Sequence, residues 1–333
     1  MEAFICKAFK GEAIVWLLRA LNNTADESLH LCKIQVLTAF GLSDVKRRPS
    51  VIQVLISGLF LGGVYALLAV GLSLAFGIMG VLNLAHGSLA VLGAILYKKS
   101  LVLHPFSPWI FSVLATPIFL CLGFILHLII VTPFRNLSLS EGVVASLIAS
   151  LGVAFILEDL FVWWQGWEPI STYFSFPTFN LFNLKIPGLR AVLMGMAAIT
   201  IGLSTLFLKK TDRGRSMRAL SQDQETASLY GINPGITSMS ALGLATIMAG
   251  LAGIFYSVLY PLGPRDGLDL TLKALFIVVA GGMGNLRGPA VAGLLLGLLE
   301  SFAGFFFTYT STDTIVYSLL IVYLVLKRGR RRQ

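Results

Sequence analysis

Residues 214–233, GRSMRALSQDQETASLYGIN, form a polar and basic island between long apolar segments. Ser221 and Gln224 have the spacing of a capping box, and Gly231 stands where a left-handed helix terminator is expected. This spacing predicts a two-turn helix over about 222–230. Such a helix is marginal alone in water, where roughly 12 to 15 residues are needed, so we expect it to fold against a partner.

A second group of polar residues follows a long apolar run. Residues 51–80 exceed the roughly 20 residues that cross a bilayer, and they lead directly into Asn83, His86 and Gly87. Non-helical backbone at membrane depth is tolerated only where it faces protein or a water-filled cavity. We therefore predict a broken helix that faces the interior, with these three residues as candidates for a translocation pathway. A lone histidine in such a place is more often a packing residue than a ligand, so both roles stay open for His86.

Glu300 is the most isolated ionisable residue within the apolar segments. A charged carboxylate at the bilayer centre costs about 2.5 to 3.5 kcal/mol on insertion scales, so Glu300 should face the bundle, pair or be protonated. Two roles stay open for it: a packing carboxylate bonded to neighbouring hydroxyls, or a part of the translocation pathway. Glu158 and Asp159 lie beside Trp163, Trp164 and Trp167, and we expect both carboxylates at the membrane surface.

The sequence offers no signature of catalysis or of a cofactor. It contains no phosphate-binding G-x-x-x-x-G-K-[ST] loop, no H-E-x-x-H and no nucleophile elbow. The 3 cysteines, Cys6, Cys32 and Cys121, show neither metal-ligand spacing nor an even set for disulfides. We assign no catalytic residue, no metal ligand and no cofactor.

Composition indicates the class of protein. Of the 333 residues, 56% are hydrophobic and only 12% are charged, which is outside the range of soluble domains. The net charge of +9 does not indicate nucleic acid here, because ten of the 25 lysines and arginines gather in two patches, at 209–218 and 327–332. Such patches next to membrane spans mark the cytoplasmic side, so we expect the 209–235 loop and the basic tail 329–333 inside the cell.

The elements that position these residues are expected to be membrane helices. We predict an all-α polytopic membrane protein with about eight or nine transmembrane helices, some of them broken. The expected spans are 51–80, a second span that ends at Lys98 and Lys99, 109–131, 142–164, 190–208, 236–262, 268–284, 288–307 and 314–326. Two glycine-interrupted stretches, 77–93 and 281–297, resemble each other and suggest an inverted repeat.

Several stretches carry a resemblance to a known family. RALSQDQETASLYGI looks like the cytoplasmic loop of ABC importer permeases, in which a Glu-Ala-Ala stretch and a following glycine dock into a cleft of the ATPase subunit. Thr226 replaces the first alanine of that pattern. LNLAHGSLAVLGA and GGMGNLRGPAVAGLLLGLLE are similar to the branched-chain amino acid permease family, and the resemblance runs from about Val51 to Arg328. It implies that the following residues contact the ATPase: Arg218, Gln222, Glu225, Ala227 and Gly231.

The resemblance also implies partners and a location. A permease of this kind forms a heterodimer with a second permease in the inner or plasma membrane of a prokaryote. Two ATPase subunits and an extracytoplasmic binding protein complete the importer, and residues 168–189 could receive the binding protein. Leucine-like amino acids lead as substrates, with urea or short amides as alternatives. A passive channel or an ion-coupled carrier is the other class, but neither needs a docking helix.

Residues 1–50 differ from the rest of the chain, since they carry mixed charges and no uninterrupted apolar run long enough to span. They do not resemble a signal peptide. We consider an amphipathic interfacial helix or an extension translated from a start chosen too early, and favour the second because the resemblance begins abruptly at Val51. Nine spans would also place residue 50 outside, although Lys46, Arg47 and Arg48 favour the inside. We therefore expect a permease domain over 51–328 and an N-terminal extension of doubtful status.

Overall fold

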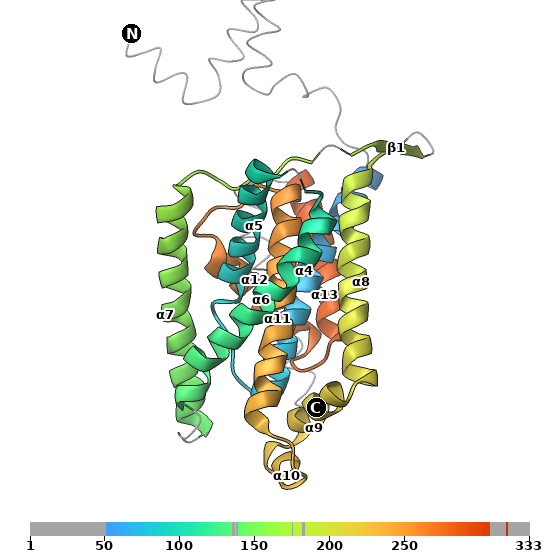
Figure 1. Cartoon of the computed structure of the whole chain (residues 1–333). Helices are drawn as coiled ribbons and strands as arrows, with labels where there is room; N and C mark the ends of the chain where they lie inside the picture. The colour runs from blue at the N-terminus through green and yellow to red at the C-terminus, as the bar shows by residue number, and fades with distance from the viewer. Residues whose placement is uncertain are drawn as a thin grey trace, which may run out of the picture. The chain divides into compact units, whose positions relative to one another are not determined.

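The computed structural model describes residues 51–104, 106–134, 137, 139–174, 176–181, 184–306 and 318. Within these residues the chain forms ten α-helices, one 3₁₀ helix and one two-stranded antiparallel sheet (Figure 1). The elements are α4 (Val51–Met79), α5 (His86–Leu103), α6 (Pro108–Ile130), η2 (Thr132–Phe134), α7 (Leu139–Gln165), β1 (Thr178–Leu181), β2 (Leu184–Pro187), α8 (Gly188–Lys210), α9 (Asp212–Gln222), α10 (Gln224–Leu229), α11 (Pro234–Leu259), α12 (Gly267–Gly281) and α13 (Arg287–Phe306).

The prediction of an all-α polytopic membrane protein is confirmed, apart from the one short β hairpin. In the part of the chain that the structure describes, six helices are long and apolar enough to cross a bilayer: α4, α6 with η2, α7, α8, α11 and α13. Helix α12 has 15 residues and rises about 22 Å, which is less than the roughly 30 Å of a hydrocarbon core. The total of eight or nine spans stays a prediction, because the expected span 314–326, the tail 329–333 and residues 1–50 fall outside the described residues apart from position 318.

Helices α4 and α11 form the centre of the bundle. In the most apolar window of each helix, 89% of the residues of α4 and 72% of those of α11 are buried. Helix α13 packs along α4, while α5 and α6 pack on α11. Figure 1 shows α7 and α8 on opposite sides of this centre, and only 22% of each of their windows is buried. Their exposed apolar side chains, such as Ile156 and Leu203, form a surface suited to lipid.

Small residues let the central helices approach closely. A Cβ atom on Gly62 of α4 would lie 2.7 Å from the Cα of Leu294 on α13. A Cβ on Gly253 of α11 would overlap the carbonyl oxygen of Ala90 on α5. Membrane helices associate through such close backbone contacts because lipid provides no hydrophobic force between them.

The two ends of the bundle carry different structures. Figure 1 shows α9 and α10 at one end and the β1–β2 hairpin at the other. We name these the α10 end and the hairpin end. In the hairpin Thr178 pairs with Pro187 and Leu181 with Leu184. The preceding segment is joined to the loop after α11 by an isolated bridge between Ile170 and Leu262.

Candidate functional site: the α10 end and the interior helix breaks

Helix α9 fixes the polar island 214–233 to the bundle. The hydroxyl of Thr211 caps its first turn by accepting a hydrogen bond from the backbone N–H of Gly214. Met217 and Leu220 are buried in a small apolar cluster with Leu74, Ile78 and Leu208 of α4 and α8. The opposite face of α9, which includes Arg218 and Gln222, is exposed. The island is therefore held by one apolar face and presents polar groups on the other.

The expected helix over 222–230 is wrong in its start. The structure has two helices, with α9 ending at Gln222 and α10 beginning at Gln224. Asp223, in extended backbone between them, accepts hydrogen bonds from the N–H groups of Glu225 and Thr226. Ser221 instead donates its hydroxyl to the carbonyl of Arg218, so the predicted capping box does not form. A carboxylate at the cap satisfies the free N–H groups and also complements the helix dipole.

Protonation of Asp223 is disfavoured in this arrangement. The Thr226 hydroxyl, followed by the N–H groups of Thr226 and Glu225, donates to the carboxylate and lowers the pKa of Asp223 below its usual value. The negative charge at the start of α10 therefore persists at neutral pH.

Gly231 ends α10 as predicted. Its φ of +81° lies in the left-handed region, and its N–H donates to the carbonyl of Ser228. The N–H of Ile232 then bonds the carbonyl of Ala227, which closes the turn. A Cβ at Gly231 would meet no atom of this chain within 4 Å.

The described surface of α10 is suited to binding another protein. Ala227 is buried against the apolar cluster of α9, whereas Glu225 is exposed. Leu229 and Tyr230 are also exposed, to 86% and 84%. These two residues were not predicted from the sequence. The sequence feature that indicates them is an apolar pair that follows a polar run. Ala227 already occupies the buried position of this short helix, which leaves the pair on the exposed side.

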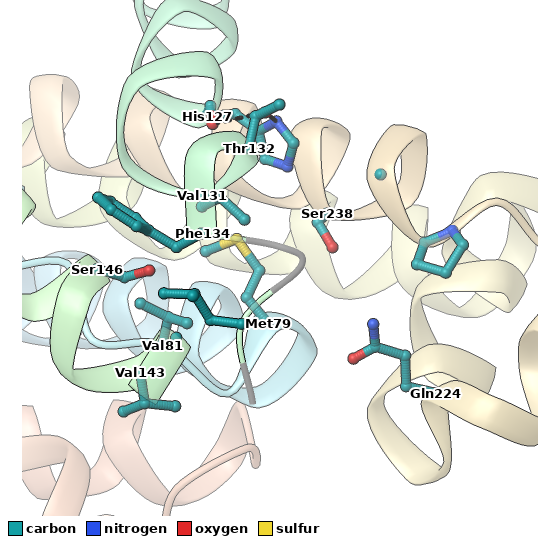
Figure 2. Close-up of a pocket in the computed structure, with 14 residues that line it drawn as sticks. Met79, Val81, His127, Val131, Thr132, Phe134, Val143, Ser146, Gln224 and Ser238 are labelled. Atoms are coloured by element: carbon teal, nitrogen blue, oxygen red, sulfur yellow. Dashed lines mark hydrogen bonds between the residues drawn. The ribbon is translucent and has the colours of Figure 1, made fainter. Parts of the chain in front are cut away.

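A cavity of about 130 Å³ lies behind the start of α10. Figure 2 shows Gln224 and Ser238, from the starts of α10 and α11, on one side of it. Ser146 and Val143 of α7 lie on the other side, with Met79 from the end of α4 between them. The cavity also reaches Val81, in the segment between α4 and α5. The first residue of α10 and the α4–α5 break thus share one space.

The predicted helix break between α4 and α5 is confirmed. Helix α4 ends at Met79, Gly80 has a φ of +67°, and α5 begins only at His86. The Nε2–H group of His86 donates to the carbonyl of Leu68 over 3.0 Å. The stretch of α4 from Leu68 to Met79 rises roughly 16 Å, so α5 begins deep inside the bundle.

The break faces protein. Asn83 is 2% exposed and His86 is 1% exposed, and neither lines the cavity behind α10. The Oδ1 atom of Asn83 accepts from the N–H of Ala85. These contacts agree with a packing role for His86. The candidacy of Asn83, His86 and Gly87 for the translocation pathway stays a prediction.

The start of α5 is joined to the start of α12. The N–H of Gly87 donates to the Thr271 hydroxyl over 2.8 Å, and that hydroxyl donates to the carbonyl of Leu84. A Cβ at Gly87 would overlap the carbonyl oxygen of Gly267, which explains why a glycine stands there. Thr271 and Gly267 lie some 180 positions after Gly87 in the chain. They were not predicted as partners of this break. Whether the two halves form an inverted repeat stays a prediction.

Glu158 is buried against α12, and its expected depth at the membrane surface stays a prediction. Its residue is 6% exposed, and its Oε1 atom accepts from the N–H of Leu268 over 3.0 Å. The unpaired N–H groups at the start of α12 attract a carboxylate into the bundle. Asp159 does lie at the surface of the hairpin end, where it pairs with Arg265 over 2.7 Å. Adjacent carboxylates thus have different surroundings because they face different sides of α7.

Glu300 of α13 forms an ion pair, which is one of the possibilities predicted from the sequence. The Nζ atom of Lys273 on α12 lies 3.2 Å from its Oε1 atom, and their side chains are only 11% and 17% exposed. Lys273 also donates to the hydroxyl of Tyr65 over 3.4 Å. Glu300 is therefore paired with a cation. Lys273 was visible in the sequence as a lone lysine in an apolar run, but nothing local indicates that it meets Glu300.

Comparison with known proteins covers nearly all of this bundle. The sequence model of the branched-chain amino acid transport system permease component matches residues 54–326. The high-affinity branched-chain amino acid transport system permease protein LivH of Salmonella typhimurium is 26% identical, over 82% of this chain and 92% of its own length. BraD of Pseudomonas aeruginosa, of the same description, is 26% identical over 83% of this chain and 94% of its own. The ribose import permease protein RbsC of Haemophilus influenzae is 27% identical over 79% and 81%. No solved structure matches.

Proposed function

This chain belongs to the branched-chain amino acid transport system permease family, and we propose that it forms the translocation pathway of a binding-protein-dependent ABC importer for branched-chain amino acids. The relatives are transport permeases, so ATP hydrolysis falls to partner subunits. The exposed helix α10, with Leu229 and Tyr230 at its end, is the observation on which this proposal depends most. A passive channel or an ion-coupled carrier has no use for such a helix.

The proposed assembly contains a second permease, two ATPase subunits and an extracytoplasmic binding protein. Lys209, Lys210, Arg213, Arg215 and Arg218 gather at the α10 end. Basic residues next to spans favour the cytoplasmic side, so this end would face the ATPases in the inner membrane of a prokaryote. The hairpin end, with the 168–189 segment, would then face the binding protein.

Docking would use apolar groups at the end of α10 and polar groups of both α9 and α10. Leu229 and Tyr230 offer apolar surface, and burying a fully exposed apolar side chain contributes about 1.5 to 3 kcal/mol. Arg218, Gln222 and Glu225 would set the orientation through polar contacts around that centre. Such an arrangement, with an aromatic anchor and a polar rim, is the usual anatomy of a specific interface.

The cavity behind α10 gives a physical connection from docking to transport. Gln224 lines it from α10, and Met79 and Val81 line it from the α4–α5 connection. A shift of α10 toward or away from the bundle would change the space available to that connection. We therefore expect ATPase closure to act on the α4–α5 break through this cavity.

The substrate is a finer question, because relatives include both branched-chain amino acid and ribose permeases. We propose leucine-like amino acids, with urea or short amides as the alternative. The test is uptake into proteoliposomes that contain the complete complex, with labelled leucine, urea and ribose each supplied in turn. We expect leucine uptake that requires both ATP and the binding protein.

The control for this experiment is a complex whose ATPase subunits bind ATP but cannot hydrolyse it. Leucine uptake that continues at the same rate in this control would favour a channel or carrier and contradict the proposal. Uptake of urea or ribose in place of leucine would leave the importer assignment intact and change its substrate.

A further inference from the structure

The Lys273–Glu300 ion pair lies halfway through the bundle. Tyr65, whose hydroxyl accepts from Lys273, is the middle residue of α4. Three helices meet at the pair, since Tyr65 belongs to α4, Lys273 to α12 and Glu300 to α13. Ionisable groups at such depth are rare and, by default, indicate an ion or substrate pathway.

The pair has an unused acceptor. Glu300 binds Lys273 through Oε1, whereas its Oε2 atom is buried and has no hydrogen-bond partner among the described residues. A buried carboxylate oxygen without a donor is costly, so its presence calls for an explanation. A cationic donor that arrives during transport would satisfy it.

Aromatic rings connect the pair with the hairpin end. Lys273 Nζ lies 5.7 Å from the centre of the Tyr65 ring. The Tyr65 and Tyr256 rings are 6.3 Å apart, and those of Tyr256 and Tyr260 are 5.9 Å apart. Tyr260 ends α11 at the hairpin end. This row of tyrosines extends from the hairpin end to the ion pair. Aromatic rings can contact both an apolar side chain and a positive charge.

We propose that Lys273 and Glu300 bind the two charged groups of a zwitterionic amino acid in transit. Glu300 receives the α-ammonium group through Oε2, and Lys273 receives the α-carboxylate. The proposal rests on the proposed importer function and names the chemical class of its substrate.

Charge balance is the physical reason for proposing a zwitterionic amino acid as the substrate. Separating Lys273 from Glu300 leaves two buried charges, and a zwitterion supplies one opposite charge to each. The site plus its substrate stays neutral throughout, so no unpaired charge enters the low-dielectric interior. Ribose and urea carry no charge and would leave both residues unpaired. The pair therefore favours amino acids over both.

The test compares a single neutral variant with a paired one in the complete reconstituted complex. Glu300→Gln leaves Lys273 without its carboxylate, while Lys273→Met/Glu300→Gln removes both charges. We expect each to lower binding-protein-dependent leucine uptake about tenfold or more, as loss of a charge-assisted contact does. Co-purification with the ATPases should be retained by the double variant. Ser301→Ala is the matched control, because it changes the neighbouring residue of α13 and removes only the bond from Ser301 to the carbonyl of Val54 on α4.

A purely structural ion pair would behave differently. Replacing a buried pair by neutral residues is often tolerated, whereas breaking it from one side is not. Recovery of normal leucine uptake in the double variant would overturn the inference and leave the importer function standing. Loss of assembly in the double variant would assign the pair to folding and also overturn it. If the unmodified complex carried no amino acid at all, the proposed function itself would fail, and the inference with it.

Discussion

Gly231→Arg is expected to detach the ATPase subunits while the permease still inserts in the membrane. The glycine has a φ of +81°, and a Cβ there would meet nothing within 4 Å in this chain. Any L-residue therefore incurs only the left-handed strain, about 1 to 2 kcal/mol. Within the isolated permease, arginine and alanine should be equally tolerated.

The difference between the two variants isolates the interface. If Gly231 lies against an ATPase cleft, Gly231→Ala weakens association by the backbone strain at most, which is about 30-fold or less. Gly231→Arg adds an unpaired charge at a buried surface, which costs a further 3 to 5 kcal/mol, roughly, or more than a hundredfold in affinity. Glu225→Ala should be milder than Gly231→Arg, because it removes one exposed polar contact without a clash.

The assay is co-purification of the ATPase subunits together with ATP hydrolysis stimulated by the binding protein. Membrane insertion is followed by the amount of permease recovered from the membrane fraction. We expect normal insertion for all three variants and loss of both ATPase readouts for Gly231→Arg. Full retention of both by Gly231→Arg would refute the assignment of α10 as the docking element.

Three further outcomes are expected. Tyr230→Ser should weaken co-purification of the ATPases about tenfold or more, because an aromatic anchor is lost from the interface; unchanged association would place the docking surface elsewhere. Gly253→Ala should lower the melting temperature of the purified permease, since its Cβ would overlap the carbonyl oxygen of Ala90. The matched Gly202→Ala, whose Cβ meets nothing within 4 Å, should be neutral or stabilise by up to about 1 kcal/mol. Deleting residues 1–48 should leave insertion and leucine uptake intact, and loss of both would identify these residues as a structural element.

The sequence by itself determined the class of the protein and the limits of most helices. Apolar runs, charge patches and glycines are local features, and bilayer thickness converts them directly into spans. The α4–α5 break, for example, follows from polar residues at the end of a run already long enough to cross. The left-handed turn at Gly231 was predicted in the same way, because a helix terminator depends on a few adjacent residues.

Local patterns failed where two nearby candidates competed. Ser221 and Asp223 can each cap the helix that follows, and the use of Asp223 divides the island into α9 and α10. That choice depends on the apolar face of α9, since Met217 and Leu220 must reach the bundle. The burial of that face is a property of the packed helices.

Only the tertiary structure decided which buried charges meet. Lys273 and Glu300 are 27 positions apart. Glu158 lies 110 positions from Leu268, whose N–H group donates a hydrogen bond to it. Helix periodicity defines the face on which a residue stands, but the partner of that face depends on how α7, α12 and α13 pack. The depth at which a helix begins also depends on packing. The starts of α5 and α12 lie inside the bundle because of their contacts with α4 and α7. Burial makes an unpaired charge costly. The partner of each buried charge is therefore known only once the packing of the helices is known.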